Sequence, residues 1–466
     1  MKEERKEEAK TTMPESYWIN EEMKRLELPD KRLEERTRKI LYDFSQNPTG
    51  SIPQFCTDGA AVKGVYGYCR NKGVEREAIV AAQKEATLGR IKAGGYQRVL
   101  SVQDTTEYKF DHHPATEGLG PLDNAKVQGF FAHTSLVVTP EGVPLGVLWQ
   151  EVWVREETAP PKAADRPIEE KESYKWIRGL AESSRGFPAD IELVQVSDQE
   201  SDIYEYLVAP RADNVELLIR SYQSRQTVDE QKEVRSKLRT SQVRGKVEVE
   251  VTKTPQRAAR TASCQVYYER VKIRPPRPRP GLPPDLKPVT LYAVLIREMR
   301  PPDGVEGLEW LLLTTLEVLD FDQACQIIRY YTLRWLVERF HFVLKSGCAL
   351  EDRQFRRADR LQRFLALANV VAWRLLWLTY VGRGRPDLPC TVAFEEDEWQ
   401  ALYCYIHKTA LLPPDPPTLQ QAILWLARLG GFLGRKSDGY PGVKVLWRGW
   451  QRLFDIAQTW LIFNPP

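Results

Sequence analysis

The chain has 466 residues and a formal net charge of +3, from 67 basic and 64 acidic side chains. This length predicts two or more domains, and a content of 42% hydrophobic residues is ample for large cores. We identify no secretory signal and no uninterrupted apolar run of about 18 residues, so we expect no membrane partner. The 7 cysteines show no metal-binding spacing, which predicts reduced thiols in the cytoplasm.

The N-terminal region divides into a tail and a helical segment. Residues 1–15 are rich in lysine and glutamate, a composition typical of a disordered tail. Residues 16–75 have helical patterning, and Asp30 stands where it can cap a helix that carries basic residues. We interpret this segment as a helical DNA-end-binding domain. Its candidate contacts are Lys31, Arg32, Arg36 and Lys63. On these residues alone, a solvated amphipathic bundle is an equally good interpretation.

Residues 76–385 are interpreted as an α/β core with a mixed sheet. Apolar strand-like runs and one helical segment, around residues 174–184, alternate up to residue 220. Two of these runs carry an acid toward their ends, Asp104 and Asp198. The carboxyl ends of strands are where an open α/β sheet places its ligands. His133 lies within a predicted strand, where we expect a satisfied structural histidine rather than a metal ligand.

Within that core, residues 225–317 have a different pattern. Short runs alternate apolar and charged residues, which predicts an antiparallel β insertion. A proline- and arginine-rich stretch, residues 274–284, predicts a loop or polyproline segment. The basic loops of this insertion suit a surface that follows a DNA backbone. A protein-binding insertion is the alternative.

After the insertion comes a charged stripe. Tyr331, Arg334, Glu338 and Lys345 are spaced 3, 4 and 7 residues apart. An α-helix turns about 100° per residue, so the four side chains are expected on one helical face. Charged stripes are usually solvated faces. Here the flanking residues are apolar and aromatic, which predicts a buried helix, where charge is costly unless it is paired or metal-bound.

Glu338 would complete a set of three carboxylates with Asp104 and Asp198. Three carboxylates suit two hard divalent cations, Mg²⁺ with Mn²⁺ as a substitute. Such a pair of ions supports metal-assisted chemistry on a phosphodiester. For any one of these acids alone, a solvated surface position is the better interpretation. The metal site is favoured only for the three together.

Residues 386–466 are predicted to be helical. A proline-rich linker precedes Thr418, which is placed to cap a helix over residues 419–429. Gly430 and Gly431 follow this helix and are typical of a helix end. The sequence alone does not assign a role to this region.

These motifs together resemble the bacterial DDE transposases of the Tn-five type, a cut-and-paste family with an RNase H-like core. The family signature Tyr-x2-Arg-x3-Glu-x6-Lys is matched by Tyr331, Arg334, Glu338 and Lys345. The contexts of the first two acids, Asp-Thr-Thr and Asp-x-Glu-x-Asp-Ile-Tyr-Glu-Tyr-Leu, are matched from Asp104 and Asp198. The stretch Leu-Glu-Trp-Leu-Leu-Leu-Thr-Thr around Trp310 resembles the strand whose tryptophan stacks on a flipped base. The similarity runs from about Trp18 to about Phe454.

The resemblance implies a fold and a set of roles. The fold is α/β, with an RNase H-like mixed-sheet catalytic core, an antiparallel β insertion and α-helical N- and C-terminal domains, the last used for dimerisation. Asp104, Asp198 and Glu338 would be the catalytic residues and the ligands of two Mg²⁺ ions. Trp310 would stack on the flipped base, although without the resemblance a core tryptophan is the better interpretation. The DNA phosphates would be bound by Tyr331, Arg334, Lys345 and Arg220.

The implied activity is DNA transposition. The protein would bind terminal inverted repeats as a homodimer in a paired-end complex, cut each end by hydrolysis, form and open a DNA hairpin, and join the end to target DNA. Its expected location is the bacterial cytoplasm, on the nucleoid. Two alternatives remain: a metal-dependent nuclease without strand transfer, and a captured, non-mobile DNA-binding protein. Residues 274–284 match no feature of the family.

Overall fold

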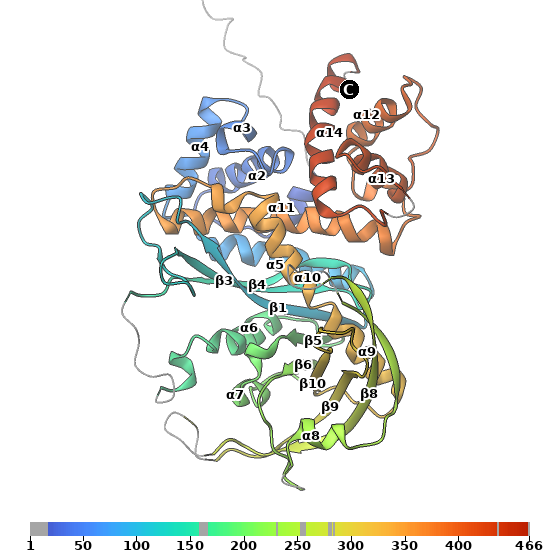
Figure 1. The fold of residues 1–466 in the computed structure, drawn as a ribbon. Helices are drawn as coiled ribbons and strands as arrows, with labels where there is room; N and C mark the ends of the chain where they lie inside the picture. Colours follow the sequence, from blue (N-terminus) through green and yellow to red (C-terminus); the bar gives the residue numbers. More distant parts are fainter. Residues whose placement is uncertain are drawn as a thin grey trace, which may run out of the picture. The chain divides into compact units, whose positions relative to one another are not determined.

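The computed structural model describes residues 17–157, 166–229, 232–251, 258–277, 282, 285–435 and 438–464. The predicted tail, residues 1–15, lies outside the described residues, and so does most of the proline- and arginine-rich stretch after Arg277. The chain forms two compact units (Figure 1). The helical unit contains Met1–Ala86, His112–Gly118 and Phe342–Pro466, and the sheet unit contains Thr87–Asp111 and Leu119–His341.

A single mixed sheet organises the sheet unit. Its order is β2-β3-β1-β5-β6-β10-β9-β8-β7, with β4 paired to β3. The strands are β1 (Arg98–Lys109), β2 (Gly120–Pro121), β3 (Gln128–Val138), β4 (Pro144–Trp153), β5 (Glu192–Ser197), β6 (Val215–Ser221), β7 (Gly245–Val251), β8 (Arg260–Ile273), β9 (Val289–Glu298) and β10 (Glu309–Thr314). Strand β5 runs parallel to β1 and β6, whereas the other pairings are antiparallel. The predicted α/β class is confirmed.

The strands of the predicted insertion continue this sheet. From β7 to β10, each strand pairs antiparallel with the next strand in the sequence. Strand β10 also pairs antiparallel with β6. An uncovered β6 would expose a row of unpaired backbone groups, and β10 satisfies them. Because of this pairing, the insertion and the acid-bearing strands share one hydrogen-bonded framework.

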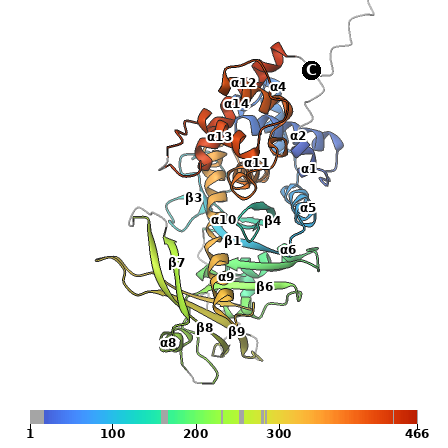
Figure 2. The same cartoon turned by 90° about the vertical axis from the view of Figure 1, so that its right-hand side faces the viewer.

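The helices of the sheet unit cover this sheet. They are α6 (Tyr174–Ser184), α7 (Tyr204–Leu207), α8 (Val234–Arg239), α9 (Phe321–Thr332) and α10 (Trp335–Phe342), with short 3₁₀ turns η2 (Ile168–Glu170) and η3 (Gln199–Ser201). Helix α6 has the predicted bounds, and its Trp176 and Leu180 belong to a buried cluster with Leu193 and Leu217. Helix α8 packs on β8 and β9 (Figure 2). Helix α5 (Arg76–Ala93) spans the boundary between the two units.

The helical unit is built from both ends of the chain. Its elements are α1 (Tyr17–Glu22), α2 (Lys31–Gln46), α3 (Ile52–Phe55), α4 (Gly59–Arg70), the π turn η4 (Val343–Gly347), η5 (Leu350–Asp352), α11 (Ala358–Gly384), η6 (Cys390–Val392), α12 (Glu396–His407), α13 (Leu419–Leu429) and α14 (Val443–Phe463). The predicted caps are present: the Asp30 side chain accepts from the amide of Arg32, and that of Thr418 accepts from the amide of Gln421.

Helix α11 forms the centre of the helical unit. By length and composition it is the one helix in the described part of the chain that could cross a membrane, but most of it is buried inside the protein. It packs against α2, α4, α13 and α14. Helix α11 is therefore a buried core helix of this unit.

Candidate active site

The first two acids lie on neighbouring parallel strands. Val102 of β1 is paired with Val196 of β5. Asp104 and Asp198 each lie two residues further along the chain. Asp198 directly follows β5 and caps η3, where its carboxylate accepts from the amide of Glu200 at 2.9 Å. The pairing register therefore brings both acids just past the end of the parallel β1–β5 pairing. Asp198 follows the end of its strand as predicted, whereas Asp104 lies in the middle of β1, which continues beside β3 to Lys109.

The charged stripe is not one continuous α-helix, which corrects the single helical face expected from its spacing. Tyr331 lies in the last turn of α9, Arg334 lies in a break between helices, and Glu338 lies on α10. In the break, the amide of Val337 bonds to the carbonyl of Arg334 three residues back, at 3.2 Å. Such a tight turn depends on tertiary packing, so the sequence spacing of the charged residues does not predict it. The π turn after α10 carries Lys345.

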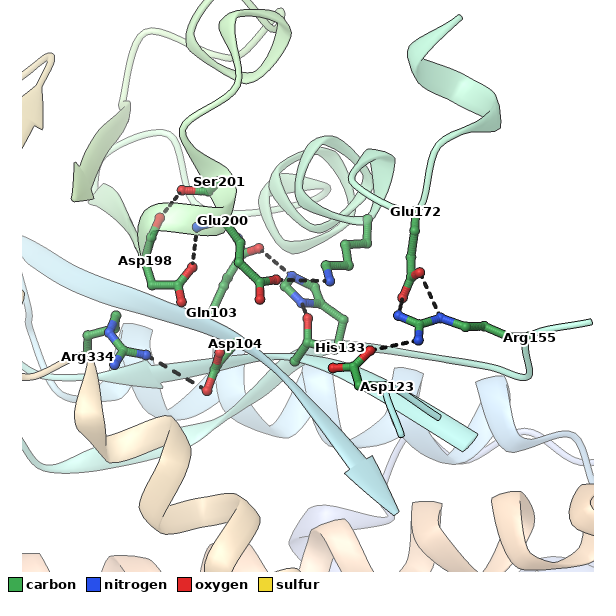
Figure 3. A network of polar contacts seen from close by, with 12 residues as sticks. Gln103, Asp104, Asp123, His133, Arg155, Glu172, Asp198, Glu200, Ser201 and Arg334 are labelled. Atoms are coloured by element: carbon green, nitrogen blue, oxygen red, sulfur yellow. Dashed lines mark hydrogen bonds and ion pairs between the residues drawn. The ribbon is translucent and has the colours of Figure 1, made fainter. Parts of the chain in front are cut away.

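Arg334 contacts both the first and the third acid, and Figure 3 shows its contact with Asp104. Its Nη1 lies 3.8 Å from Oδ2 of Asp104, and its Nη2 forms a short ion pair with Oε1 of Glu338. The side chains of Asp104 and Arg334 are 19% and 17% exposed, whereas Glu338 is 54% exposed. One guanidinium thus contacts two carboxylates. Figure 3 shows Asp198 near Asp104 and Arg334.

Burial is the main electrostatic effect in this cluster. Burial, with a smaller contribution from the nearby Asp198 and Glu338 and against the opposing effect of Arg334, raises the pKa of Asp104 to about 7. Burial also raises the pKa of Asp198. Burial opposes the charge on Arg334, but its acidic neighbours outweigh this and hold its pKa above the usual range. The charge of Arg334 therefore does not offset the effect of burial on Asp104 and Asp198.

The donor set has the chemistry of a hard-cation site. Carboxylate oxygens are the ligands that Mg²⁺ and Mn²⁺ prefer, and a divalent cation would supply the positive charge that this cluster lacks. Within the described ranges, however, no three His, Cys, Asp or Glu side chains already stand in an arrangement that could hold a metal ion. The residue types fit such an ion, and Arg334 holds Glu338 in the geometry seen here.

Trp310 and Tyr331 form an aromatic pair beside this cluster. Trp310 lies on β10, and its ring meets that of Tyr331 edge to face with centroids 5.1 Å apart. Both residues line a pocket of about 520 Å³ together with Arg220 of β6 and with Arg334. Arg220 also forms a hydrogen bond with Tyr331 that lowers the phenol pKa, although burial raises it more. Half-buried Trp310 is accessible from this pocket and is not a core tryptophan.

The remaining predicted residues lie in the helical unit. Lys345 belongs to it through the π turn. Lys31, Arg32 and Arg36 are exposed on α2, and Lys63 is exposed on α4. The Arg36 side chain lies against α4 at Gly64. A Cβ atom at Gly64 would lie 2.2 Å from Nη1 of Arg36. Arg32 and Arg36 line a hollow of about 450 Å³.

The sequence did not single out Lys175 and Glu200, which lie beside the second acid. Lys175 Nζ lies 3.3 Å from Oε2 of Glu200, and only 9% of the Lys175 side chain is exposed. Its ammonium also lies 5.6 Å from the centre of the Trp153 ring. One signal existed: Lys175, Gly179 and Ser183 share a spacing of four residues, which places this lysine on the buried face of α6.

Comparison with known protein families gives two matches, both outside this site. Taken by themselves, the sheet and its acids define an α/β protein with a candidate active site at the ends of parallel strands. Residues 15–74 match the family model described as Transposase DNA-binding. Residues 370–459 match the model described as Transposase Tn5 dimerisation domain. These two matches confirm the similarity to Tn5-type transposases, and they support DNA binding and assembly as a dimer.

Proposed function

We propose that the protein is a cut-and-paste DNA transposase with an RNase H-like catalytic core, active in the cytoplasm on its own terminal inverted repeats. The observation that supports this proposal is the pairing of Arg334 with both Asp104 and Glu338, with Asp198 near enough to Arg334 for that charge to lower its pKa against burial. The family matches at both ends of the chain support the same conclusion independently, because they do not include these residues.

We assign Asp104, Asp198 and Glu338 as the ligands of two Mg²⁺ ions, with Mn²⁺ as a substitute. When bound, such ions stabilise the attacking and leaving oxygens of an in-line displacement at phosphorus. Arg334 would leave Glu338 and bind a DNA phosphate, since a guanidinium pairs well with either anion. This exchange would free the Glu338 carboxylate and balance the charge around Asp104.

The reaction would proceed in four displacements at phosphorus. Water attacks a phosphodiester at the element's end, and the 3′ oxygen leaves as a free hydroxyl. That hydroxyl attacks the opposite strand and forms a hairpin, releasing the flanking DNA. A second water opens the hairpin, and the 3′ hydroxyl then joins target DNA. The groups proposed to hold the phosphates are Tyr331, Arg334, Lys345 and Arg220.

Trp310 would stack on a base that leaves the helix as the hairpin forms, because a tight bend cannot keep every base stacked. Stacking is worth about 1–3 kcal/mol per base. We therefore expect Trp310→Ala to slow hairpin formation by about 10- to 100-fold while first-strand nicking stays nearly unchanged. Trp310→Phe, which keeps an aromatic ring, should retain most of the hairpin rate. Equal loss of nicking and hairpin formation in Trp310→Ala would contradict this role.

The test of the proposal is cleavage of a linear duplex that carries the inverted repeat flanking the gene, with Mg²⁺, resolved on a denaturing gel. We expect a hairpin band that disappears with EDTA and in Glu338→Gln. A nick without a hairpin would favour the metal-dependent nuclease. Binding without any cut, in Mg²⁺ and in Mn²⁺, would favour the captured DNA-binding protein.

A further inference from the structure

A row of hydrogen bonds lies on the face of β1 opposite Asp104. Successive side chains of a strand point to opposite faces, so Gln103 and Thr105 share the face that Asp104 does not use. His133 of β3 connects them: its Nδ1 lies 2.9 Å from Oγ1 of Thr105, and its Nε2 lies 3.0 Å from Oε1 of Gln103 (Figure 3). The imidazole is completely buried and meets the Trp176 ring edge to face.

The row continues into the second acid-bearing strand and ends on a helix. Gln103 Nε2 donates to Oε1 of Gln195 on β5 at 2.6 Å. Gln195 Nε2 donates to Oγ of Ser183 on α6 at 2.7 Å, and this hydroxyl donates to the carbonyl of Gly179 at 2.5 Å. The row therefore links α6, β5, β1 and β3 through buried side chains.

The carbonyl of Gly179 fixes the direction of every bond in this row. A carbonyl only accepts, so Ser183 must give its proton to Gly179 and accept from the amide nitrogen of Gln195. The oxygen of Gln195 then faces Gln103, which must donate with its own nitrogen. This turns the oxygen of Gln103 toward His133, so the imidazole carries its proton on Nε2.

Thr105 is the last member of the row, and its hydroxyl donates a hydrogen bond to His133. Burial keeps the pKa of His133 well below its usual range, and Lys175 lowers it further. The imidazole is thus neutral, and its Nδ1 is an acceptor that takes the Thr105 proton. Each member therefore has one role as donor or acceptor. Reversing any one of these hydrogen bonds would leave a buried polar group unpaired, which is unfavourable.

We propose that this row positions the two acids, with His133 and Thr105 as positioning residues for Asp104. Gln103 and Thr105 flank Asp104 in sequence, and Gln195 lies three residues before Asp198. Apolar contacts have no direction and would tolerate small shifts between β1 and β5, whereas hydrogen bonds are directional and hold one register. This inference rests on the proposed function, because it concerns the spacing of the carboxylates that would hold the metal.

The first test measures Mn²⁺ binding by electron paramagnetic resonance on the full chain, beside DNA cleavage and thermal unfolding. Thr105→Val keeps the shape of the side chain but removes the donor, and Thr105→Ser keeps the donor. We expect Thr105→Val to weaken Mn²⁺ binding and cleavage by about 10-fold, as loss of supporting groups around a metal typically does. Thr105→Ser should restore both. Asp104→Asn gives the reference for a lost ligand.

The outcomes separate this inference from the proposed function. If the unmodified chain binds Mn²⁺ and cleaves, but Thr105→Val changes only the thermal unfolding midpoint, the row is merely structural and the inference is wrong. If the unmodified chain neither binds Mn²⁺ nor cleaves, the proposed function fails, and the inference fails with it. If Thr105→Ser behaves like Thr105→Val, the hydroxyl proton is not the determinant and the inference is also overturned.

A second measurement reads the direction of the row without any activity. The chain has 5 histidines, so ¹⁵N labelling of histidine gives a spectrum simple enough to assign by His133→Gln. We expect the His133 signals of a neutral ring protonated on Nε2, and we expect them to be unchanged in Asp104→Asn. A ring protonated on Nδ1 would reverse the Thr105 bond and overturn the proposal.

Discussion

The two faces of β1 around Asp104 are both polar and both largely buried, yet they differ in how far their charges and hydrogen bonds are satisfied. On one face, Thr105, His133 and Gln103 belong to a row in which each donor has an acceptor. On the other, Asp104 shares the cation Arg334 with Glu338, and its pKa is raised to about 7. The first face is complete without a ligand, and the second is not.

This difference teaches how to tell a structural polar cluster from a binding one. A satisfied network stabilises the fold, and breaking it leaves unpaired groups. An unsatisfied cluster of like charges costs stability and is retained where a ligand or substrate supplies the missing charge. Substitutions on the two faces should therefore change stability in opposite directions, while only one face should be indispensable for catalysis.

The largest expected effect is on cleavage. Glu338→Gln removes a carboxylate from the incomplete face, and we expect DNA cleavage to fall by roughly a thousand-fold or more while DNA binding stays unchanged. Asp190→Asn, which changes an exposed acid of the same unit, is the control and should cleave normally. Cleavage by Glu338→Gln at the unmodified rate would remove Glu338 from the site.

The next effect is on the complete face. His133→Leu leaves Gln103 and Thr105 without their buried partner, so we expect the free energy of unfolding of the sheet unit to fall by about 2–5 kcal/mol. Urea unfolding followed by tryptophan fluorescence measures this loss. His112→Leu, at an exposed histidine, should change stability by no more than about 0.5 kcal/mol. Equal effects of the two substitutions would show that the row does not stabilise the fold.

Asp104→Asn should act in the opposite direction. The pKa of Asp104 is about 7 in the folded chain against an ordinary 3.8. Between these values the folded carboxyl keeps a proton that the unfolded one has released, so stability falls as the pH rises through this window. At pH 8 with a chelator, we expect Asp104→Asn to be about 1–3 kcal/mol more stable than the unmodified chain. At pH 4 the two should be nearly equal. Added Mg²⁺ should stabilise only the unmodified chain.

The smallest expected effect is on the pH dependence of stability in the helical unit. It distinguishes an acid whose pKa is raised by burial from an acid in a metal-binding site. In the helical unit, burial, with smaller contributions from the charges of Asp397 and Glu395, raises the pKa of Glu398 to about 8. Stability should thus fall as the pH rises from about 4.5 to about 8, and Glu398→Gln should gain about 1 kcal/mol at pH 9 but not at pH 4. Mg²⁺ should not alter this gain. A gain that Mg²⁺ abolishes would indicate a second metal site. Glu396→Gln, at an exposed position, is the control.

Local patterns predicted much of the fold. The bounds of α6 and α13 follow from apolar spacing and from the Thr418 cap, and the place of Asp198 follows from the end of its strand, whereas Asp104 lies within β1. What the sequence could not predict depends on contacts between distant residues. The break at Arg334, the pairing of β10 with β6 and the partners of His133 are fixed by packing in three dimensions. The prediction that the charged stripe lies on one helix was therefore wrong, and the roles of its residues stay a prediction.

The π turn at Val343–Gly347 has a consequence for how relatives of this chain should be aligned. A π turn contains one residue more than a regular helical turn, here closed by the amide of Cys348 bonding to the carbonyl of Val343 at 2.8 Å. A related chain with one residue fewer between its counterparts of Glu338 and Lys345 would form an ordinary turn at this point. A single-residue gap there would mark a regularised helix and not the loss of the motif.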